Sequence, residues 1–240
     1  MEAATREAFV SEFIGTYFLV LTVGFNVLQN TALAPVSIGA MLMAMIFSTG
    51  KVSGAHFNPA VTLGVLLRQN KIRQADAMVY MLVQILGAVC AGLTYVYVLG
   101  ASFTLGPGVG YGYPAVFIVE LLFTAALVFV VLNVATTAQD TGNWYYGLAI
   151  GFTVMSAAFA IGPISGCCLN PAVAIGIMLS NLVLKGSVKF LTLLVYIVAS
   201  FLGAALAAGF FRVIREQEYK DLKKEVSNYG TNSRGSPLPS

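Results

Sequence analysis

The segment SGAHFNPAVTLG at residues 53–64 returns at residues 165–176 as SGCCLNPAVAIG, with seven of the twelve positions identical. In each copy an asparagine followed by a proline predicts the start of a helix. Asparagine is a favoured helix cap, and proline suits the first helical turn. Two such helix starts within a very apolar chain predict a pore in which two amide-bearing helix N-termini meet.

The composition places the chain in a lipid bilayer. Hydrophobic residues make up 58% and charged residues 10% of the sequence, whereas a soluble domain carries roughly 25% charged residues. The net charge of +3 is too small and too dispersed to indicate a nucleic-acid partner. The three cysteines, at 90, 167 and 168, show neither a disulfide framework nor the ligand spacing of a zinc site. We therefore expect no metal, no cofactor and no enzymatic activity.

Hydropathy predicts six membrane spans and two shorter helices. Apolar stretches of spanning length lie at about 9–29, 34–51, 77–99, 114–136, 145–163 and 188–212. The second and fifth run directly into the two repeated segments, whose apolar continuations of about 9–12 residues are too short to cross a membrane. Short, proline-started segments at matching places in two halves predict re-entrant half-helices.

The repeat extends well beyond the two motifs. Glu12 corresponds to Glu120 and Tyr80 to Tyr196, and each half holds three spans and one half-helix. Because three is odd, the second half enters from the opposite face, and the repeat is inverted. The predicted fold is therefore an all-α membrane protein. Residues 1–212 form one channel domain, with repeats at about 9–99 and 114–212, followed by a polar tail at 213–240 that is mostly disordered.

The positions of the basic residues predict the orientation. Under this topology eleven of the 13 lysines and arginines lie on the face that carries both termini, and only Lys185 and Lys189 lie on the other. The positive-inside rule then places both termini in the cytoplasm. The uncharged, glycine-rich loop at 100–113 suits the outer face. The sequence does not distinguish the plasma membrane from the membrane of a vacuole-like organelle.

These features together resemble the aquaporins, the major intrinsic protein family. The resemblance covers residues 9–212 and rests on the inverted six-span repeat, on Glu12 and Glu120, and on two Asn-Pro-Ala boxes, namely Asn58, Pro59, Ala60 and Asn170, Pro171, Ala172. It implies a right-handed bundle of six tilted helices with two half-helices in its middle. It also implies water and small neutral solutes as the cargo, and a homotetramer in which each subunit has its own pore.

The predicted pore chemistry centres on the two asparagines. Asn58 and Asn170 are expected to turn amide N–H groups toward the lumen. Each half-helix adds about half a positive charge at its N-terminus, so cations and hydrated protons are repelled. The resemblance implies that backbone carbonyls preceding each box accept hydrogen bonds from water, namely those of Gly54, Ala55 and His56 and of Gly166, Cys167 and Cys168.

Three ionisable side chains lie within or next to predicted membrane segments. Glu12 and Glu120 are the only acids deep in predicted spans, where a carboxylate needs partners. We expect each to accept hydrogen bonds from the neighbouring re-entrant loop, with proton or sodium coupling as the alternative. His56 is the only histidine, and the sequence leaves open whether it pairs with Glu12 or acts as a pH gate.

The predicted selectivity filter departs from that of most water-selective members, which carry an arginine three residues after the second asparagine. This chain has Val173 there, and no arginine occurs between Arg73 and Arg212. Counting from the motifs assigns the other filter positions to Ile38, Ala158 and Cys167. Such a filter is wider and less polar, and it resembles that of vacuolar, tonoplast-intrinsic-like members. The aspartate typical of glycerol channels is also absent, since Ala174 occupies its position.

The sequence therefore predicts a passive water channel that also passes small neutral solutes. A facilitator mainly for glycerol, urea, ammonia or hydrogen peroxide is the closest alternative. A coupled secondary transporter is less well supported, because it needs ionisable residues at the midplane. A membrane junction or scaffold protein with an inactive pore is a further alternative.

Overall fold

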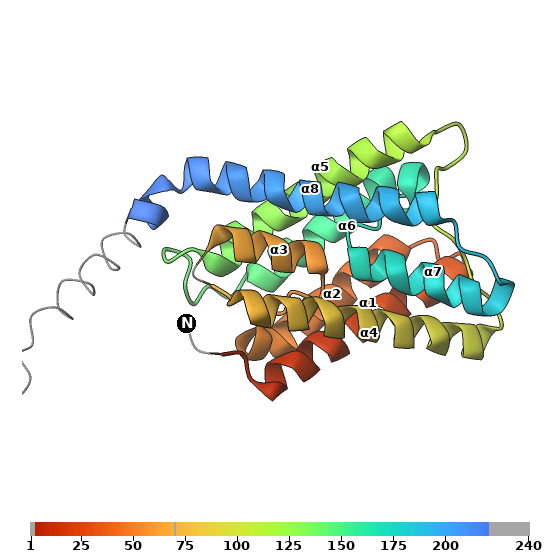
Figure 1. Cartoon of the computed structure of the whole chain (residues 1–240), viewed down its shortest axis with the longest axis horizontal. Helices are drawn as coiled ribbons and strands as arrows, with labels where there is room; N and C mark the ends of the chain where they lie inside the picture. Colours follow the sequence, from red (N-terminus) through yellow and green to blue (C-terminus); the bar gives the residue numbers. More distant parts are fainter. Residues whose placement is uncertain (1–2, 70, 221–240) are drawn as a thin grey trace, which may run out of the picture.

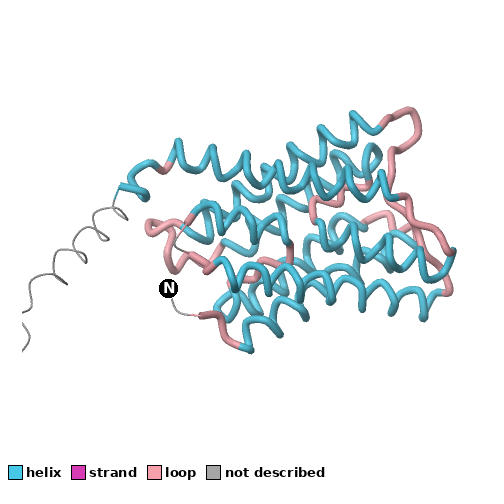
Figure 2. The backbone as a smooth tube through the Cα atoms, viewed as in Figure 1, coloured by secondary structure: helices cyan, strands magenta, loops and turns pink. Residues whose placement is uncertain are grey.

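The computed structural model describes residues 3–69 and 71–220, which form eight helices. Figure 2 shows only helices and loops in this part of the chain. Six helices are long and apolar enough to cross a membrane: α1 (Arg6–Leu28), α2 (Ala34–Ser53), α4 (Gln74–Leu99), α5 (Tyr113–Thr136), α6 (Tyr146–Ser165) and α8 (Phe190–Ile214). Two shorter helices, α3 (Pro59–Arg68) and α7 (Pro171–Lys185), follow α2 and α6. The predicted six spans and two half-helices are confirmed.

The packing between helices repeats from one half to the other. α1 contacts α2 and α4, and in the same way α5 contacts α6 and α8. Each half-helix packs against the last span of the opposite half, α3 against α8 and α7 against α4. In Figure 1 the two half-helices run from the middle of the bundle toward opposite ends. This arrangement is the inverted repeat that the sequence predicted.

The two ends of the bundle carry different loops. The N-terminus and the C-terminal end of α8 lie at the same end of the molecule, which we call the terminus end (Figure 1). Residues 137–145 also lie there, whereas residues 100–112 and 186–189 lie at the opposite end, which we call the far end. Both termini of the described chain are therefore on one face, as six spans require.

The same backbone geometry ends α2 and α6 and starts the half-helices. Gly54 and Gly166 cap the two spans with φ near +84° and +83°, a conformation that glycine adopts without steric cost. Asn58 and Asn170 then cap α3 and α7 in extended conformation. Between the caps, four non-glycine residues have positive φ of 50–52°: Ala55, Phe57, Cys167 and Leu169. Each re-entrant loop thus has the same irregular backbone, which spans a membrane only where protein or a wet cavity surrounds it.

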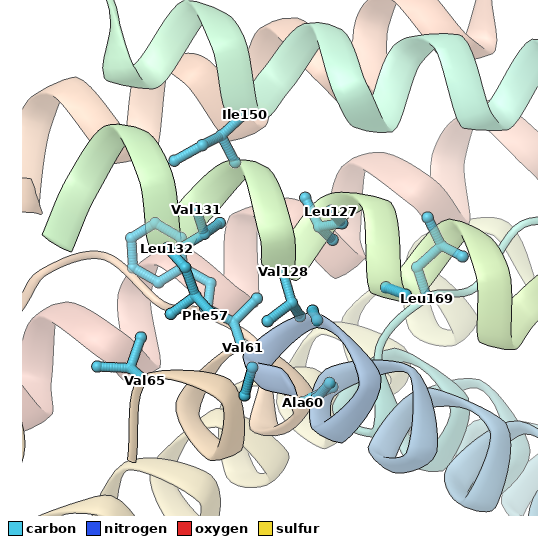
Figure 3. Packing of buried hydrophobic residues seen from close by; sticks show 14 of the residues in the cluster. Phe57, Ala60, Val61, Val65, Leu127, Val128, Val131, Leu132, Ile150 and Leu169 are labelled. Atoms are coloured by element: carbon cyan, nitrogen blue, oxygen red, sulfur yellow. The ribbon is translucent and has the colours of Figure 1, made fainter. Parts of the chain in front are cut away.

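Small residues let the helices approach closely. A Cβ on Gly87 of α4 would lie 2.5 Å from the carbonyl oxygen of Phe13, and one on Gly203 of α8 would lie 2.5 Å from that of Leu121. α3 packs with similar closeness on α5: a Cβ on Gly64 would lie 2.3 Å from the Cγ1 of Val128, and Val61 lies beside Val128 (Figure 3). In a membrane such close packing replaces the hydrophobic driving force between helices.

Two elements are longer than the sequence predicted. α7 has 15 residues instead of about 9–12, because the helix continues until Gly186 caps it with φ +69°. α8 continues to Ile214, and residues 216–220 form a further helical turn that packs against the bundle. Tyr219 is only 9% exposed, so the predicted tail at 213–240 begins with a packed segment. Residues 221–240 lie outside the described part of the chain.

Candidate pore and selectivity filter

The two motif asparagines meet in the middle of the bundle and bind each other's loop. The amide nitrogen Nδ2 of Asn58 donates to the Leu169 carbonyl at 2.8 Å, and that of Asn170 donates to the Phe57 carbonyl at 2.9 Å. The Oδ1 atoms accept the backbone N–H of Ala60 and Ala172, respectively, at 2.8 and 2.9 Å. An amide NH₂ has two N–H donors. One N–H of each amide thus binds the opposite re-entrant loop. The other has no acceptor among the described residues and is free for a ligand in the cavity that both asparagines line.

The residues expected to supply acceptors form the two re-entrant loops. Across the described residues, no protein donor reaches the carbonyl oxygens of residues 54–56 or 166–168. The flanking carbonyls differ, because Tyr80 donates its hydroxyl to the Ser53 carbonyl at 2.8 Å and Tyr196 donates its hydroxyl to that of Ser165. The loop carbonyls are therefore the ones left with open acceptor sites.

Glu12 and Glu120 are completely buried and hold these loops. Glu12 accepts the hydroxyl of Ser53 at 2.7 Å, the backbone N–H of His56 at 2.9 Å and of Phe57 at 2.7 Å, and the side-chain amide of Gln84 at 2.8 Å. Both oxygens of the carboxylate therefore have partners within the protein.

Glu120 repeats this pattern with one donor fewer. It accepts the hydroxyl of Ser165 at 2.6 Å and the backbone N–H of Cys168 and Leu169 at 2.9 and 2.7 Å. The second half has no partner like Gln84, because Ser200 occupies the equivalent position and its shorter side chain has no hydrogen-bond partner among the described residues.

The His56 ring does not bind Glu12, which corrects one of the two interpretations left open by the sequence. Its Nδ1 lies 3.1 Å from the hydroxyl of Thr62, and the ring packs edge-on against Tyr80 with centroids 5.3 Å apart. The backbone N–H, not the imidazole, reaches Glu12. The histidine thus presents its ring to the passage rather than to the buried carboxylate.

One cavity of about 220 Å³ collects the predicted pore residues. Its lining includes both asparagines, His56 and the four predicted filter residues Ile38, Ala158, Cys167 and Val173. A second cavity of about 300 Å³ opens at the terminus end beside Lys71 and Asp76, and His56 lines it as well. The filter positions counted from the motifs are therefore brought together around one space.

The loop at 100–112 also lines this cavity, which no pattern in the sequence predicted. Phe103, Thr104, Leu105 and Gly106 belong to its lining. A Cβ added to Gly166 would lie 3.3 Å from the Cδ2 of Leu105. The N–H of Gly108 donates to the Ile164 carbonyl at 2.9 Å. The far-end loop is thus fastened to the second re-entrant loop beside Cys167, and it adds two bulky apolar side chains and one hydroxyl to the mouth.

Comparison with known proteins identifies the family. The family model described as major intrinsic protein matches residues 2–211, with a second match over residues 147–234. The chain belongs to the major intrinsic protein family. The resemblance drawn from the sequence is therefore confirmed, and so is the expectation of a channel rather than an enzyme.

Relatives in this family come from plants and bacteria. Aquaporin NIP1-4 of Oryza sativa subsp. japonica is 34% identical over 215 residues, which cover 86% of this chain and 76% of the relative. The glycerol uptake facilitator protein-like 6 of Lactiplantibacillus plantarum is 35% identical over 222 residues, which cover 88% of this chain and 99% of that protein. This chain is accordingly a multi-pass membrane channel for water and small solutes.

A solved structure shows the same fold. The aquaglyceroporin from Plasmodium falciparum superimposes with a TM-score of 0.77 and covers 88% of this chain and 97% of its own. The sequence identity is 23%, so this likeness bears on the fold alone.

Proposed function

We propose that this major intrinsic protein conducts water past Asn58 and Asn170 and also passes small uncharged solutes through an arginine-free filter. The observation that carries the proposal is the single cavity lined by both asparagines and by Ile38, Ala158, Cys167 and Val173. The reciprocal amide–carbonyl bonds hold the two asparagines at one level of this cavity.

Exclusion of charge follows from the helix ends. α3 and α7 each direct the positive end of a helix dipole at the centre of the passage, and the free amide N–H groups point the same partial charge at the permeant. A water molecule there accepts from the amides, and the open carbonyls of residues 54–56 and 166–168 accept its hydrogens on either side. Glu12 and Glu120 act structurally in this account, because they hold the loops that carry these carbonyls.

Passage of solutes follows from the filter. Three of its four side chains are aliphatic, the fourth is a thiol, and no arginine side chain is available between residues 73 and 212. Width and lining polarity decide what a channel admits. The relative named as a glycerol uptake facilitator supports a polyol among the cargo. The likeness of this filter to vacuolar members stays a prediction.

Osmotic stopped-flow measurements on proteoliposomes test the proposal. We expect water permeability well above that of protein-free vesicles, and faster entry of glycerol or urea than the lipid alone allows. Water flux without any solute flux would refute the wide filter, and solute flux without water flux would establish the facilitator as the better description. Ammonia and hydrogen peroxide complete the same series of solutes.

Coupled transport has little support from the site. A coupling residue must exchange protons or sodium ions with the passage, whereas both oxygens of Glu12 and of Glu120 accept hydrogen bonds from loop donors. A solute flux that depends on a proton or sodium gradient would favour this alternative.

We further propose an orientation and an assembly. The excess of lysine and arginine on the predicted face that carries both termini supports a cytoplasmic location of both termini, with the plasma membrane or a vacuole-like organelle membrane as the host membrane. Family membership supports a homotetramer with one passage per subunit. Chemical crosslinking in detergent would test the tetramer, and protease access to the C-terminus in sealed vesicles would test the orientation.

Mercury is expected to slow water permeation, because the partly exposed Cys167 lines the cavity as one of the proposed filter residues. A bound mercury atom adds bulk at the narrowest predicted point. Stopped-flow rates should fall on addition of Hg²⁺ for the natural protein and stay unchanged for Cys167→Ser. Cys90→Ser is the control, since Cys90 is exposed on α4 outside the cavity and its loss should preserve sensitivity. Equal inhibition of Cys167→Ser would show that Cys167 is not in the filter.

A further inference from the structure

A buried arginine ends the first half-helix. Arg68 is the last residue of α3, and it is only 1% exposed. α3 has ten residues, so Arg68 lies about 15 Å along the helix axis from the cap Asn58. An arginine in such a place needs a full set of partners, because a buried charge without them is strongly destabilising.

Partners for Arg68 come from three separate parts of the chain. Its Nε donates to the Thr136 hydroxyl at 3.1 Å, its Nη2 to the Thr136 carbonyl at 3.2 Å and its Nη1 to the Gln69 carbonyl at 3.3 Å. Nη2 also forms an ion pair with Oε2 of Glu218 at 2.5 Å. The guanidinium carbon lies 5.4 Å from the ring centroid of Phe211 and 5.9 Å from that of Tyr219, within the range of cation–π attraction.

The segment after α8 supplies two of these partners and reaches further. The second oxygen of Glu218 accepts the backbone N–H of Ala138 at 2.8 Å. Tyr219 packs edge-on against Phe211 with ring centroids 6.4 Å apart. Glu218 therefore bridges the end of α3 and the loop that follows α5. Figure 1 shows this segment folded at the end of α8, at the terminus end of the bundle.

This cluster borders the second cavity, which shares His56 with the pore cavity. Thr136, which accepts two hydrogen bonds from Arg68, also lines the cavity at the terminus end. Val65, one turn before Arg68 on α3, lines the same cavity, together with Val131 and Ala135 of α5. A shift of the Arg68 end of α3 would thus change both this cavity and the tilt of the helix that presents Asn58.

We propose that Glu218 and Tyr219 complete a socket for Arg68 that positions α3 in the pore, so that Arg68 and Glu218 are positioning residues for permeation. The inference rests on the proposed function, because it needs a passage that α3 helps to shape. Glu12 holds the Asn58 end of α3 through the loop before it. The socket holds the opposite end, and without it only the packing of α3 against its neighbouring helices holds that end. The segment 215–219 then affects permeation through the position of α3.

Glu218→Gln tests this proposal against a matched control. The variant keeps the shape of the side chain but removes the charge that faces Arg68. Glu216→Gln removes a carboxylate from the same turn, where Glu216 pairs with the exposed Lys220. Water permeability is measured by stopped flow and divided by the number of folded channels in the vesicles, and its activation energy is measured in the same series.

The expected result is a several-fold lower permeability per folded channel and a higher activation energy for Glu218→Gln. Glu216→Gln should match the natural protein, and Glu218→Asp, which keeps the charge, should recover part of the loss. A chain that ends at Ile214 should lose at least as much as Glu218→Gln. A purely structural role would lower the yield of folded protein but leave permeability per channel unchanged.

Unchanged permeability per channel in Glu218→Gln and in the shortened chain would overturn the inference while leaving the proposed function intact. A natural protein that conducts no water would overturn both. The two failures are therefore distinguished within one set of measurements.

Discussion

Glu12→Ala is expected to remove most of the water permeability and to lower the free energy of unfolding by several kcal/mol. The substitution leaves four buried donors without an acceptor, those of Ser53, His56, Phe57 and Gln84. Each unsatisfied buried donor costs about 1–3 kcal/mol. The loop before Asn58 would then reorganise, and with it the carbonyls that face the passage. Thermal unfolding in detergent and stopped-flow water permeability measure the two effects.

Two variants make this prediction specific. Glu120→Ala should lower the free energy of unfolding by less, because it leaves three buried donors without an acceptor instead of four. Asp140→Asn removes a carboxylate from the loop at the terminus end, outside the membrane, and should leave permeability unchanged. The hydrogen bond from Thr137 lowers the pKa of Asp140, so this control also removes a charge.

The flux that remains in Glu12→Ala decides between a structural and a coupling role. A structural role predicts the same ratio of solute to water permeability as in the natural protein. Natural stability and flux in the alanine variant would show that Glu12 does not hold the loop. If solute flux through the natural protein depends on a proton gradient and flux through Glu12→Ala does not, Glu12 has a coupling role.

Val173→Arg is expected to lower glycerol and urea permeability by about tenfold or more while water continues to pass. Val173 lies at the start of α7 among the cavity residues and is 5% exposed. An arginine there would occupy width and bring a fixed positive charge with up to five donors. Channel selectivity depends on both properties. Stopped-flow swelling with each solute, beside water, measures the change.

Val173→Leu separates width from charge. Leucine adds volume but no donor and no charge, so it should reduce solute permeation less than arginine does. Equal effects of the two variants would show that width alone sets the selectivity. Unchanged solute permeation in Val173→Arg would mean that residue 173 is not in the filter.

The sequence was sufficient for the elements that repeat. Span positions follow from apolar length, and Gly54, Asn58, Gly166 and Asn170 mark helix ends by their own conformational preferences. Counting from the asparagines also selected Ile38 and Ala158, and both line the cavity. That count succeeds because each helix keeps a fixed rise per residue up to the glycine that ends it.

Contacts between distant, non-repeating segments could not be predicted. The loop residues Phe103–Gly106 have no periodic pattern, and only the tertiary fold turns them into the cavity mouth. Arg68 and Glu218 are 150 positions apart, and each alone is typical of a solvent-exposed charge. The His56 ring binds Thr62 and not Glu12, because the local geometry of the loop decides which side chain the ring reaches.

Water and proton flux measured in the same proteoliposomes test the central claim most directly. The account predicts rapid osmotic water flow with a low activation energy, and proton entry under an imposed pH gradient no faster than in protein-free vesicles. The amides of Asn58 and Asn170, held at the centre of one cavity, are the reason for both results. Proton entry that rises with the amount of protein, or water flow no faster than that of lipid alone, would contradict it.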